Sequence, residues 1–225
     1  MKYIKAKKLD IVEDISKSIS DKLANNLNLL WLVSGGSNIE IEVSILNKLE
    51  NLVDTSRLTI VPIDERYGIY NYKDSNSFQL RQTGFNPAKA RFIDVLDKNL
   101  TFDETVNYYN GLIRRLYEKS DYIIAQFGLG ADGHIAGIKP LSPASSVDVK
   151  DFVIGYNWSD FDRLTLCKKG FKDIDEAYLV ALSDDKVPAI ERLRQRSESV
   201  NELPAMLLNT ISKTYVYNSY IESEE

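Results

Sequence analysis

The chain has one cysteine, Cys167, and one histidine, His134, among its 225 residues. A single cysteine forms no intramolecular disulfide, and this points to the reducing environment of the cytoplasm. One cysteine and one histidine also cannot build a zinc site of the usual kind. The single histidine is instead a candidate for acid–base chemistry near neutral pH.

The sequence also lacks a long apolar run and an excess of positive charge. No run approaches the roughly 18 apolar residues of a membrane span, and segment 1–14 has lysines but no apolar core of a secretory signal. The net charge is −5, whereas nucleic-acid-binding domains are usually basic. These absences argue against membrane and nucleic-acid partners, and the expected place of action is the cytoplasm.

Composition and spacing predict a single α/β domain over residues 1–225. Hydrophobic residues make up 44% of the chain and charged residues 27%, as in an ordinary globular protein. No repeat or Pro/Gly/Ser linker interrupts it. Apolar residues at four-residue spacing predict helices over 10–27 and 38–49. A capping box at Thr101 and Glu104 predicts a third helix, and 186–194 predicts a fourth with a proline in its first turn.

Short apolar runs predict strands between these helices. The expected strands are 29–33, 58–64, 121–130, 152–157, 163–167, 177–183 and 213–218. Pro62 in the second strand is expected at a bulge or at the strand's end. Alternating strands and helices indicate a mainly parallel sheet, in which ligands bind beyond the carboxyl ends of the strands. The acidic C-terminal SYIESEE is expected to fray.

Ser34-Gly35-Gly36-Ser37 follows the strand 29–33 directly. Glycines let backbone N–H groups approach a ligand, and Ser37 is placed to cap the next helix. Because a helix N-terminus favours anions, this segment is a candidate phosphate site. An ordinary strand-to-helix turn explains the same residues equally well.

Two further strand ends carry polar groups. Asp64-Glu65-Arg66 follows the strand 58–64, and it is either a substrate-orienting group or a solvated charge cluster. Residues 128–134, GLGADGH, match the dinucleotide pattern G-x-G-x-x-G. We reject that reading because Pro140 and Pro143 leave no room for the helix that the pattern opens.

Asp132 and His134 lie two residues apart on the bend that this glycine-rich segment predicts. A neutral imidazole is the usual general base near neutral pH, and a neighbouring carboxylate can orient it. The alternative is a histidine without a catalytic role. The glycine loop, the neighbouring acid and the position at a strand end favour a functional pair.

These segments, in this order, resemble the 6-phosphogluconolactonase family. The matching motifs are LVSGGS (32–37), DER (64–66), DSN (74–76), GLGADGHIAGIKP (128–140), DRLTL (162–166), DDK (184–186) and LPA (203–205). The superfamily also includes glucosamine-6-phosphate deaminase. The resemblance implies a Rossmann-like, mainly parallel sheet with helices on both faces. It further implies hydrolysis of 6-phospho-D-glucono-1,5-lactone to 6-phosphogluconate in the oxidative pentose phosphate pathway, without cofactor or metal.

The resemblance also assigns roles to individual residues. His134 would deprotonate the attacking water, and Asp132 would orient His134 or the substrate. Arg163 and Lys186 would grip the phosphate; without the resemblance, both are expected to be surface residues. The other substrate-binding residues implied are Ser34, Gly35, Gly36 and Ser37 at the phosphate, Asp64 at the sugar, and Arg66 at the sugar, the phosphate or the lactone carbonyl.

The sequence departs from the family pattern at several positions. Asn38-Ile39 stands where the lactonases usually have Thr-Pro, and the segment after His134 reads IAGIKP. The deaminases place their catalytic glutamate at the position of Lys139, so a deaminase reaction is not expected here. Two alternatives stay open: a deaminase-like enzyme, and a sugar-phosphate-binding protein without catalysis. The expected partner is a small sugar phosphate, and the expected oligomeric state is a monomer.

Overall fold

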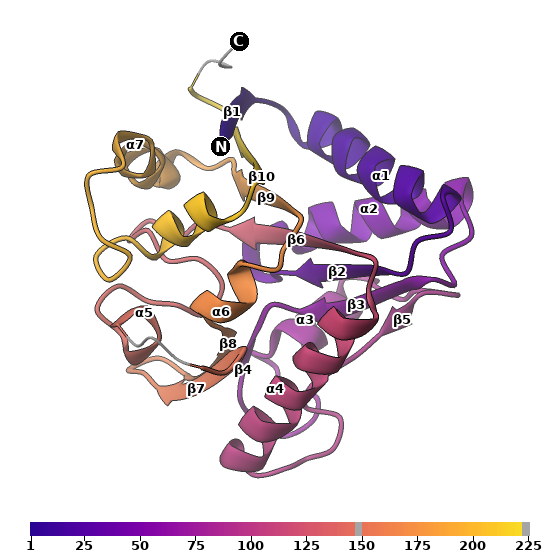
Figure 1. The fold of residues 1–225 in the computed structure, drawn as a ribbon, viewed down its shortest axis with the longest axis horizontal. Coiled ribbons are helices and arrows are strands. Elements are labelled where there is room, and N and C mark those ends of the chain that lie inside the picture. The colour runs from indigo at the N-terminus through magenta and orange to yellow at the C-terminus, as the bar shows by residue number, and fades with distance from the viewer. Residues whose placement is uncertain (147–149, 222–225) are drawn as a thin grey trace.

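A seven-stranded parallel sheet forms the centre of the computed structural model, which describes residues 1–146 and 150–221 (Figure 1). Its strand order is β1 (Lys2–Lys5), β10 (Lys213–Asn218), β9 (Glu176–Ala181), β6 (Tyr122–Gly128), β2 (Leu29–Val33), β3 (Leu58–Pro62) and β5 (Arg91–Phe92). Every neighbouring pair in this sheet is parallel. The predicted α/β fold with a mainly parallel sheet is therefore confirmed.

Helices cover both faces of the sheet, because each central strand sends alternate side chains to two different cores. In β2, Leu30 and Leu32 belong to one core and Trp31 to the other. The helices on the Trp31 face include α1 (Lys8–Ala24), α2 (Ile39–Leu52) and α3 (Asn76–Gln82), and those on the opposite face include α4 (Phe102–Lys119) and α7 (Val187–Gln195). A strand that is buried on both faces reads as a continuous apolar run, as LLWLV does.

The predicted helix signals hold in all but one case. Thr101 and Glu104 form the capping box of α4, and α7 begins with proline in its first turn. The expectation that Ser37 caps the second helix was wrong. A 3₁₀ turn, η1 (Gly36–Asn38), precedes α2, and the N-cap residue of α2 is Asn38, whose side chain makes no capping hydrogen bond.

A second, antiparallel sheet of three strands was not predicted. It consists of β4 (Asp64–Arg66), β8 (Asp162–Leu166) and β7 (Val153–Asn157), in that order. The predicted strand 58–64 was too long, because β3 ends at Pro62 and the chain then leaves the main sheet. The charged segment 64–66 is thus a strand in itself, paired with β8, and not the end of a parallel strand.

The remaining short elements lacked a strong sequence signal. They are α5 (Pro143–Ser146), α6 (Lys168–Phe171), η2 (Asp184–Lys186) and η3 (Pro204–Thr210). Strands β1 and β5 and helix α3 were also not expected, because each is seven residues or fewer. The fraying predicted for the acidic C-terminus falls partly on residues 222–225, which lie outside the described residues.

Candidate active site

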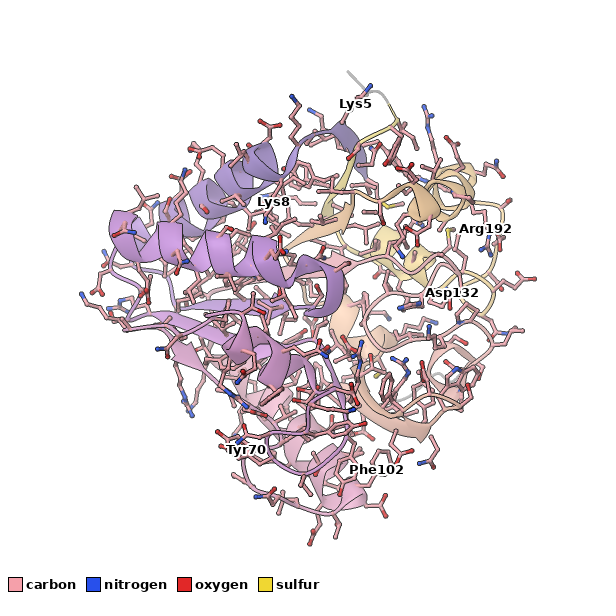
Figure 2. The ribbon with its side chains drawn as sticks, turned by 180° about the vertical axis from the view of Figure 1, so that it is seen from behind. Lys5, Lys8, Tyr70, Phe102, Asp132 and Arg192 are labelled. Atoms are coloured by element: carbon pink, nitrogen blue, oxygen red, sulfur yellow. The ribbon has the colours of Figure 1, made fainter. Side chains whose placement is uncertain are left out.

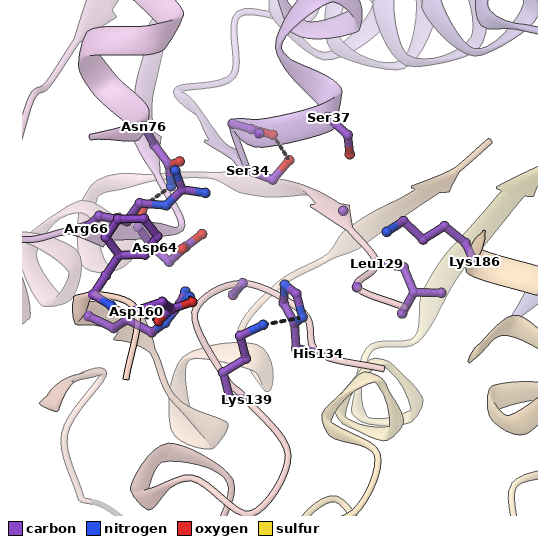
Figure 3. Close-up of a pocket in the computed structure, with 17 residues that line it drawn as sticks. Ser34, Ser37, Asp64, Arg66, Asn76, Leu129, His134, Lys139, Asp160 and Lys186 are labelled. Carbon is purple, nitrogen blue, oxygen red and sulfur yellow. Dashed lines mark hydrogen bonds and ion pairs between the residues drawn. The ribbon is translucent and has the colours of Figure 1, made fainter. Parts of the chain in front are cut away.

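A cavity of about 270 Å³ lies where the carboxyl ends of β2 and β6 meet the small sheet (Figure 3). It is lined by Ser34, Gly35, Gly36, Ser37, Asp64, Arg66, Asn76, Gly128, Leu129, Gly130, His134, Ala136, Lys139, Asp160, Phe161, Arg163 and Lys186. The structure thus gathers in one cavity all the site residues proposed from the sequence except Asp132. That residue lies directly behind the histidine.

The single histidine pairs with a carboxylate at this cavity. His134 Nδ1 lies 2.5 Å from Asp132 Oδ1, and the backbone N–H of His134 donates to the same oxygen over 3.1 Å. An ionised carboxylate only accepts hydrogen bonds, so at this distance the ring proton is on Nδ1. Nε2 is then the nitrogen with a free lone pair. This is the tautomer that a general base requires.

Lys139 contacts the same pair. Its Nζ lies 3.2 Å from Asp132 Oδ2 and 3.1 Å from His134 Nδ1. Because Nδ1 already carries a proton, the ammonium donates to Asp132 and not to the ring. Burial raises the pKa of the Asp132 carboxyl, but the hydrogen bond and charge of His134, together with the charge of Lys139, hold it well below its usual range. Asp132 is therefore ionised at neutral pH, ready to stabilise an imidazolium.

The loop that carries this pair is a tight turn that depends on Gly130. The N–H of Gly130 donates to the His134 carbonyl over 2.9 Å, and that of Gly133 donates to the Gly130 carbonyl over 2.9 Å. A Cβ on Gly130 would lie 1.9 Å from His134 Nδ1, so only glycine lets the imidazole lie against this backbone. From α7, Arg192 donates to the Asp132 carbonyl over 3.3 Å and fixes the loop from outside (Figure 2).

The loop 34–37 folds around a buried carboxylate that the sequence reasoning missed. Glu42 on α2 is fully buried, and its Oε1 accepts the Ser34 N–H (2.8 Å) and the Ser34 hydroxyl (3.0 Å). The Gly35 N–H donates to both of its oxygens over 3.2 and 3.3 Å. Burial raises the pKa of Glu42 to about 7. In the expected phosphate loop, the backbone N–H groups of Ser34 and Gly35 thus donate to Glu42. Gly36 and Ser37 are exposed to the cavity.

Strand β4 presents alternate residues to the cavity, as the two-residue period of a strand requires. Asp64 and Arg66 line the cavity, whereas Glu65 points away and accepts the backbone N–H groups of Asn76 (2.6 Å) and Ser77 (3.0 Å). Burial raises the pKa of Asp64 to about 6, against the opposing charges of nearby arginines and His134. Only the outer two residues of this segment can therefore touch a ligand.

Two arginines share one aromatic ring at this end of the cavity. The guanidinium of Arg66 lies 4.7 Å from the ring centre of Phe161, and that of Arg163 lies 5.7 Å from it. Arg163 is 5% exposed and donates from Nη2 to Asp160 over 2.7 Å. Its buried Nε has no hydrogen-bond partner among the described residues. An unpaired buried donor of this kind is costly.

Apart from Lys139, which lies beside His134, the cations of the cavity fall into two groups. Figure 3 shows Lys186 on one side of His134, and Arg66 and Asp160 on the other. Because Arg163 is bonded to Asp160, it belongs to the second group. The structure therefore brings Lys186 together with the loop 34–37, and it places the two residues expected to share the phosphate at opposite ends.

Six residues of the site were missed at the level of sequence. They are Glu42, Asn76, Lys139, Asp160, Phe161 and Arg192. The burial of Glu42 could have been predicted, because it stands beside Ile41 on the apolar side of a predicted helix. Asn76 and Lys139 lie within matched motifs without an assigned role. Asp160 and Phe161 stand just before Arg163 in the chain and contact it, whereas Arg192 is brought to the site by a tertiary contact that leaves no local pattern.

In residues 1–146 and 150–221, no cluster of three or more His, Cys, Asp or Glu side chains is arranged to hold a metal ion. None of the helices in those ranges is long and apolar enough to cross a membrane.

Comparison with known proteins gives one family and several relatives. A family model described as glucosamine-6-phosphate isomerases/6-phosphogluconolactonase matches residues 5–216. A probable 6-phosphogluconolactonase of Dictyostelium discoideum is 28% identical over 165 residues, 69% of each chain. A 6-phosphogluconolactonase of Borreliella burgdorferi is 26% identical over 150 residues, which span 66% of this chain and 63% of that protein.

A solved structure of a monomeric glucosamine-6-phosphate deaminase superposes with a TM-score of 0.77. Its sequence is 19% identical, and the match covers 97% of both chains. At this identity the similarity establishes the fold alone, which is the Rossmann-like architecture described above.

Proposed function

The chain belongs to the family of glucosamine-6-phosphate isomerases and 6-phosphogluconolactonases, and from this we propose that it hydrolyses 6-phospho-D-glucono-1,5-lactone to 6-phosphogluconate. It is a hydrolase acting on a carboxylic ester, with a role in the oxidative pentose phosphate pathway. The curated relatives with this name support the choice of reaction. The observation that carries it is the His134–Asp132 pair, which offers a base at a cavity rich in cations.

In the proposed reaction His134 acts as the general base. A water oxygen attacks the lactone carbonyl carbon while Nε2 takes one proton from the water. The tetrahedral oxyanion then collapses, the bond between the carbonyl carbon and the ring oxygen breaks, and the imidazolium returns the proton to that oxygen. Asp132 stabilises the transient imidazolium. A positioned base supplies about 10²–10⁴-fold in rate.

The two cationic ends of the cavity suit the two ends of the substrate. We assign the phosphate to Lys186 and to the exposed Gly36 and Ser37, because backbone N–H groups at a helix start favour anions. The buried Arg163, with an unpaired Nε, faces the sugar end together with Arg66, where an oxyanion donor adds on the order of 10²–10³-fold. Phosphate binding then holds the carbonyl in register for attack.

The deaminase reading is weaker for this chain. The resemblance puts the catalytic acid of deaminases at position 139. In this chain that position holds a lysine, Lys139, whose side chain contacts His134. The structural similarity to a deaminase concerns the fold only. Ammonia release from glucosamine 6-phosphate remains the measurement that would favour it.

The test is hydrolysis of freshly generated lactone, coupled to 6-phosphogluconate dehydrogenase, with the spontaneous rate subtracted. The wild type is expected to accelerate hydrolysis, and His134→Ala to lose about 10²–10⁴-fold of that acceleration while keeping its thermal midpoint. No acceleration by the wild type would refute the lactonase. Binding of 6-phosphogluconate without turnover would instead indicate a non-catalytic sugar-phosphate-binding protein.

We further propose the setting in which the enzyme acts. It works as a single-domain monomer in the cytoplasm, on a small sugar phosphate and without nucleic-acid or membrane partners. The lone, buried cysteine and the net charge of −5 support this setting. Light scattering coupled to gel filtration tests the monomer.

A further inference from the structure

We propose that Lys139 determines the substrate class of this site. Its ammonium favours a sugar phosphate whose reacting carbonyl group becomes an oxyanion, and it disfavours one that carries an amino cation. The inference rests on the proposed function, since it concerns the same cavity. It adds a specificity-determining residue to the site.

The backbone around Lys139 is built to hold this side chain in the cavity. Ile135 and Ile138 are fully buried and pair with each other through an isolated β-bridge. Ala136 between them has a φ of +48°, which makes the bend sharp. The N–H of Lys139 donates to the hydroxyl of Tyr156 over 3.3 Å. His134 and Lys139 therefore leave opposite ends of one short, anchored bend and meet at the cavity.

The side chain of Lys139 is not an ordinary surface lysine. It is only 17% exposed, and its Nζ lies 3.2 Å from Asp132 Oδ2 and 3.1 Å from the imidazole of His134. An ammonium has three protons, and Asp132 accepts one of them. The others are available to a ligand at the position where the base acts (Figure 3).

The carboxylates at this end already have cation neighbours. Asp132 is paired with Lys139, Asp160 is paired with Arg163 over 2.7 Å, and Asp64 lies in the field of Arg163 and Arg66. Among the described residues that line the cavity, Asp64 and Asp160 each have a cation as a neighbour, so a ligand's ammonium group would meet carboxylates whose charge is already partly balanced.

The two ligand classes bring opposite charges to the position of Lys139. Lactone hydrolysis converts a neutral carbonyl into an oxyanion and then a carboxylate, both of which an ammonium stabilises. An amino sugar phosphate is a cation at its amino group near neutral pH and is repelled by Lys139. Because both ligands carry the same phosphate, its binding contributes equally and the difference reports on the sugar end.

The experiment compares two ligands in three variants by isothermal titration calorimetry near neutral pH. The ligands are 6-phosphogluconate and glucosamine 6-phosphate. Lys139→Met removes the charge, Lys139→Arg keeps it, and Lys119→Met changes an exposed lysine at the end of α4 as the matched control. The wild type and the control are expected to bind 6-phosphogluconate at least about tenfold more tightly, a difference of about 1.4 kcal/mol.

Lys139→Met is expected to reduce this preference by about tenfold or more, through weaker binding of 6-phosphogluconate and tighter binding of glucosamine 6-phosphate. Lys139→Arg keeps the positive charge and is therefore expected to keep the preference for 6-phosphogluconate. A purely structural role of the lysine would not predict that result. An unchanged affinity ratio in Lys139→Met would overturn the inference, and so would wild-type turnover of glucosamine 6-phosphate. Failure of the lactonase assay alone would refute the proposed reaction, since the affinity ratio is measured without turnover.

Discussion

Replacing Glu42 with leucine tests whether the buried carboxyl holds the loop 34–37 in place. Near pH 6, below the pKa of about 7 to which burial raises Glu42, the group is mostly protonated, so the change removes hydrogen-bond acceptors and not charge. The N–H groups of Ser34 and Gly35 lose their partner, at about 1–3 kcal/mol each. Because Ser34 is half-buried and accessible to water, we expect about 2–4 kcal/mol in total. For a chain of this size, that lowers Tm by roughly 4–15 °C.

The assay is thermal unfolding by circular dichroism, paired with lactonase kinetics. Glu42→Gln keeps one acceptor for both N–H groups and is expected to recover most of the Tm. Glu40→Gln is the control, because Glu40 is exposed on the same helix and pairs only with Lys8 at the surface. The KM of Glu42→Leu should also rise, since the displaced loop carries the proposed phosphate donors. A Tm within about a degree of the control and an unchanged KM would show that the carboxyl does not hold the loop.

Three further predictions follow from the same contacts. Gly130→Ala is expected to reduce kcat about 10²–10⁴-fold with little change in Tm, because the new Cβ displaces the His134 ring and the Asp132 carboxylate, both of which are side chains at the cavity and not part of the core; a normal kcat would contradict this. Lys186→Ala is expected to raise KM about tenfold or more with kcat changed less than about threefold, and an unchanged KM would remove Lys186 from the phosphate site. Burial raises the pKa of Glu42 and Glu65 from 4.5 to about 7, so the folded state holds these protons more tightly than the unfolded state. Their contribution therefore makes the free energy of unfolding fall as pH rises from about 4.5 to 7, by roughly 3 kcal/mol for each group; urea titrations of the wild type and Glu65→Gln across this range should differ in slope, and equal slopes would argue against the shift.

The central strands of the main sheet, β2 and β6, were predictable because they are apolar on both faces. LLWLV and the run after Asp121 bury side chains in both cores. Each therefore appears in the sequence as a continuous apolar run, which indicates a buried strand. The small sheet was not predictable in the same way. Its strand β4 is three charged residues long, and only pairing with β8 makes it a strand. Pro62 gave the one local hint that the main strand ends before Asp64.

The site followed from the sequence where its residues are neighbours in the chain. Asp132 and His134 are two residues apart, so a bend alone brings them together. The contact of Glu42 with Ser34 depends on the 3₁₀ turn between them, and that of Arg66 with Phe161 depends on the pairing of β4 with β8. Such contacts carry no spacing rule, which is why the division of the cavity into two cationic ends could not be foreseen.

The place of β1 at the edge of the main sheet has a consequence for folding. Its only partner in that sheet is β10, which lies about 200 residues later in the chain. At about 5–20 residues per second, a ribosome needs on the order of 10–40 s to make that interval. Until then, the neighbouring strand of β1 has not been made. Closure of this edge is therefore expected to be a late step in the folding of the newly made chain, and contacts so distant in sequence fold slowly.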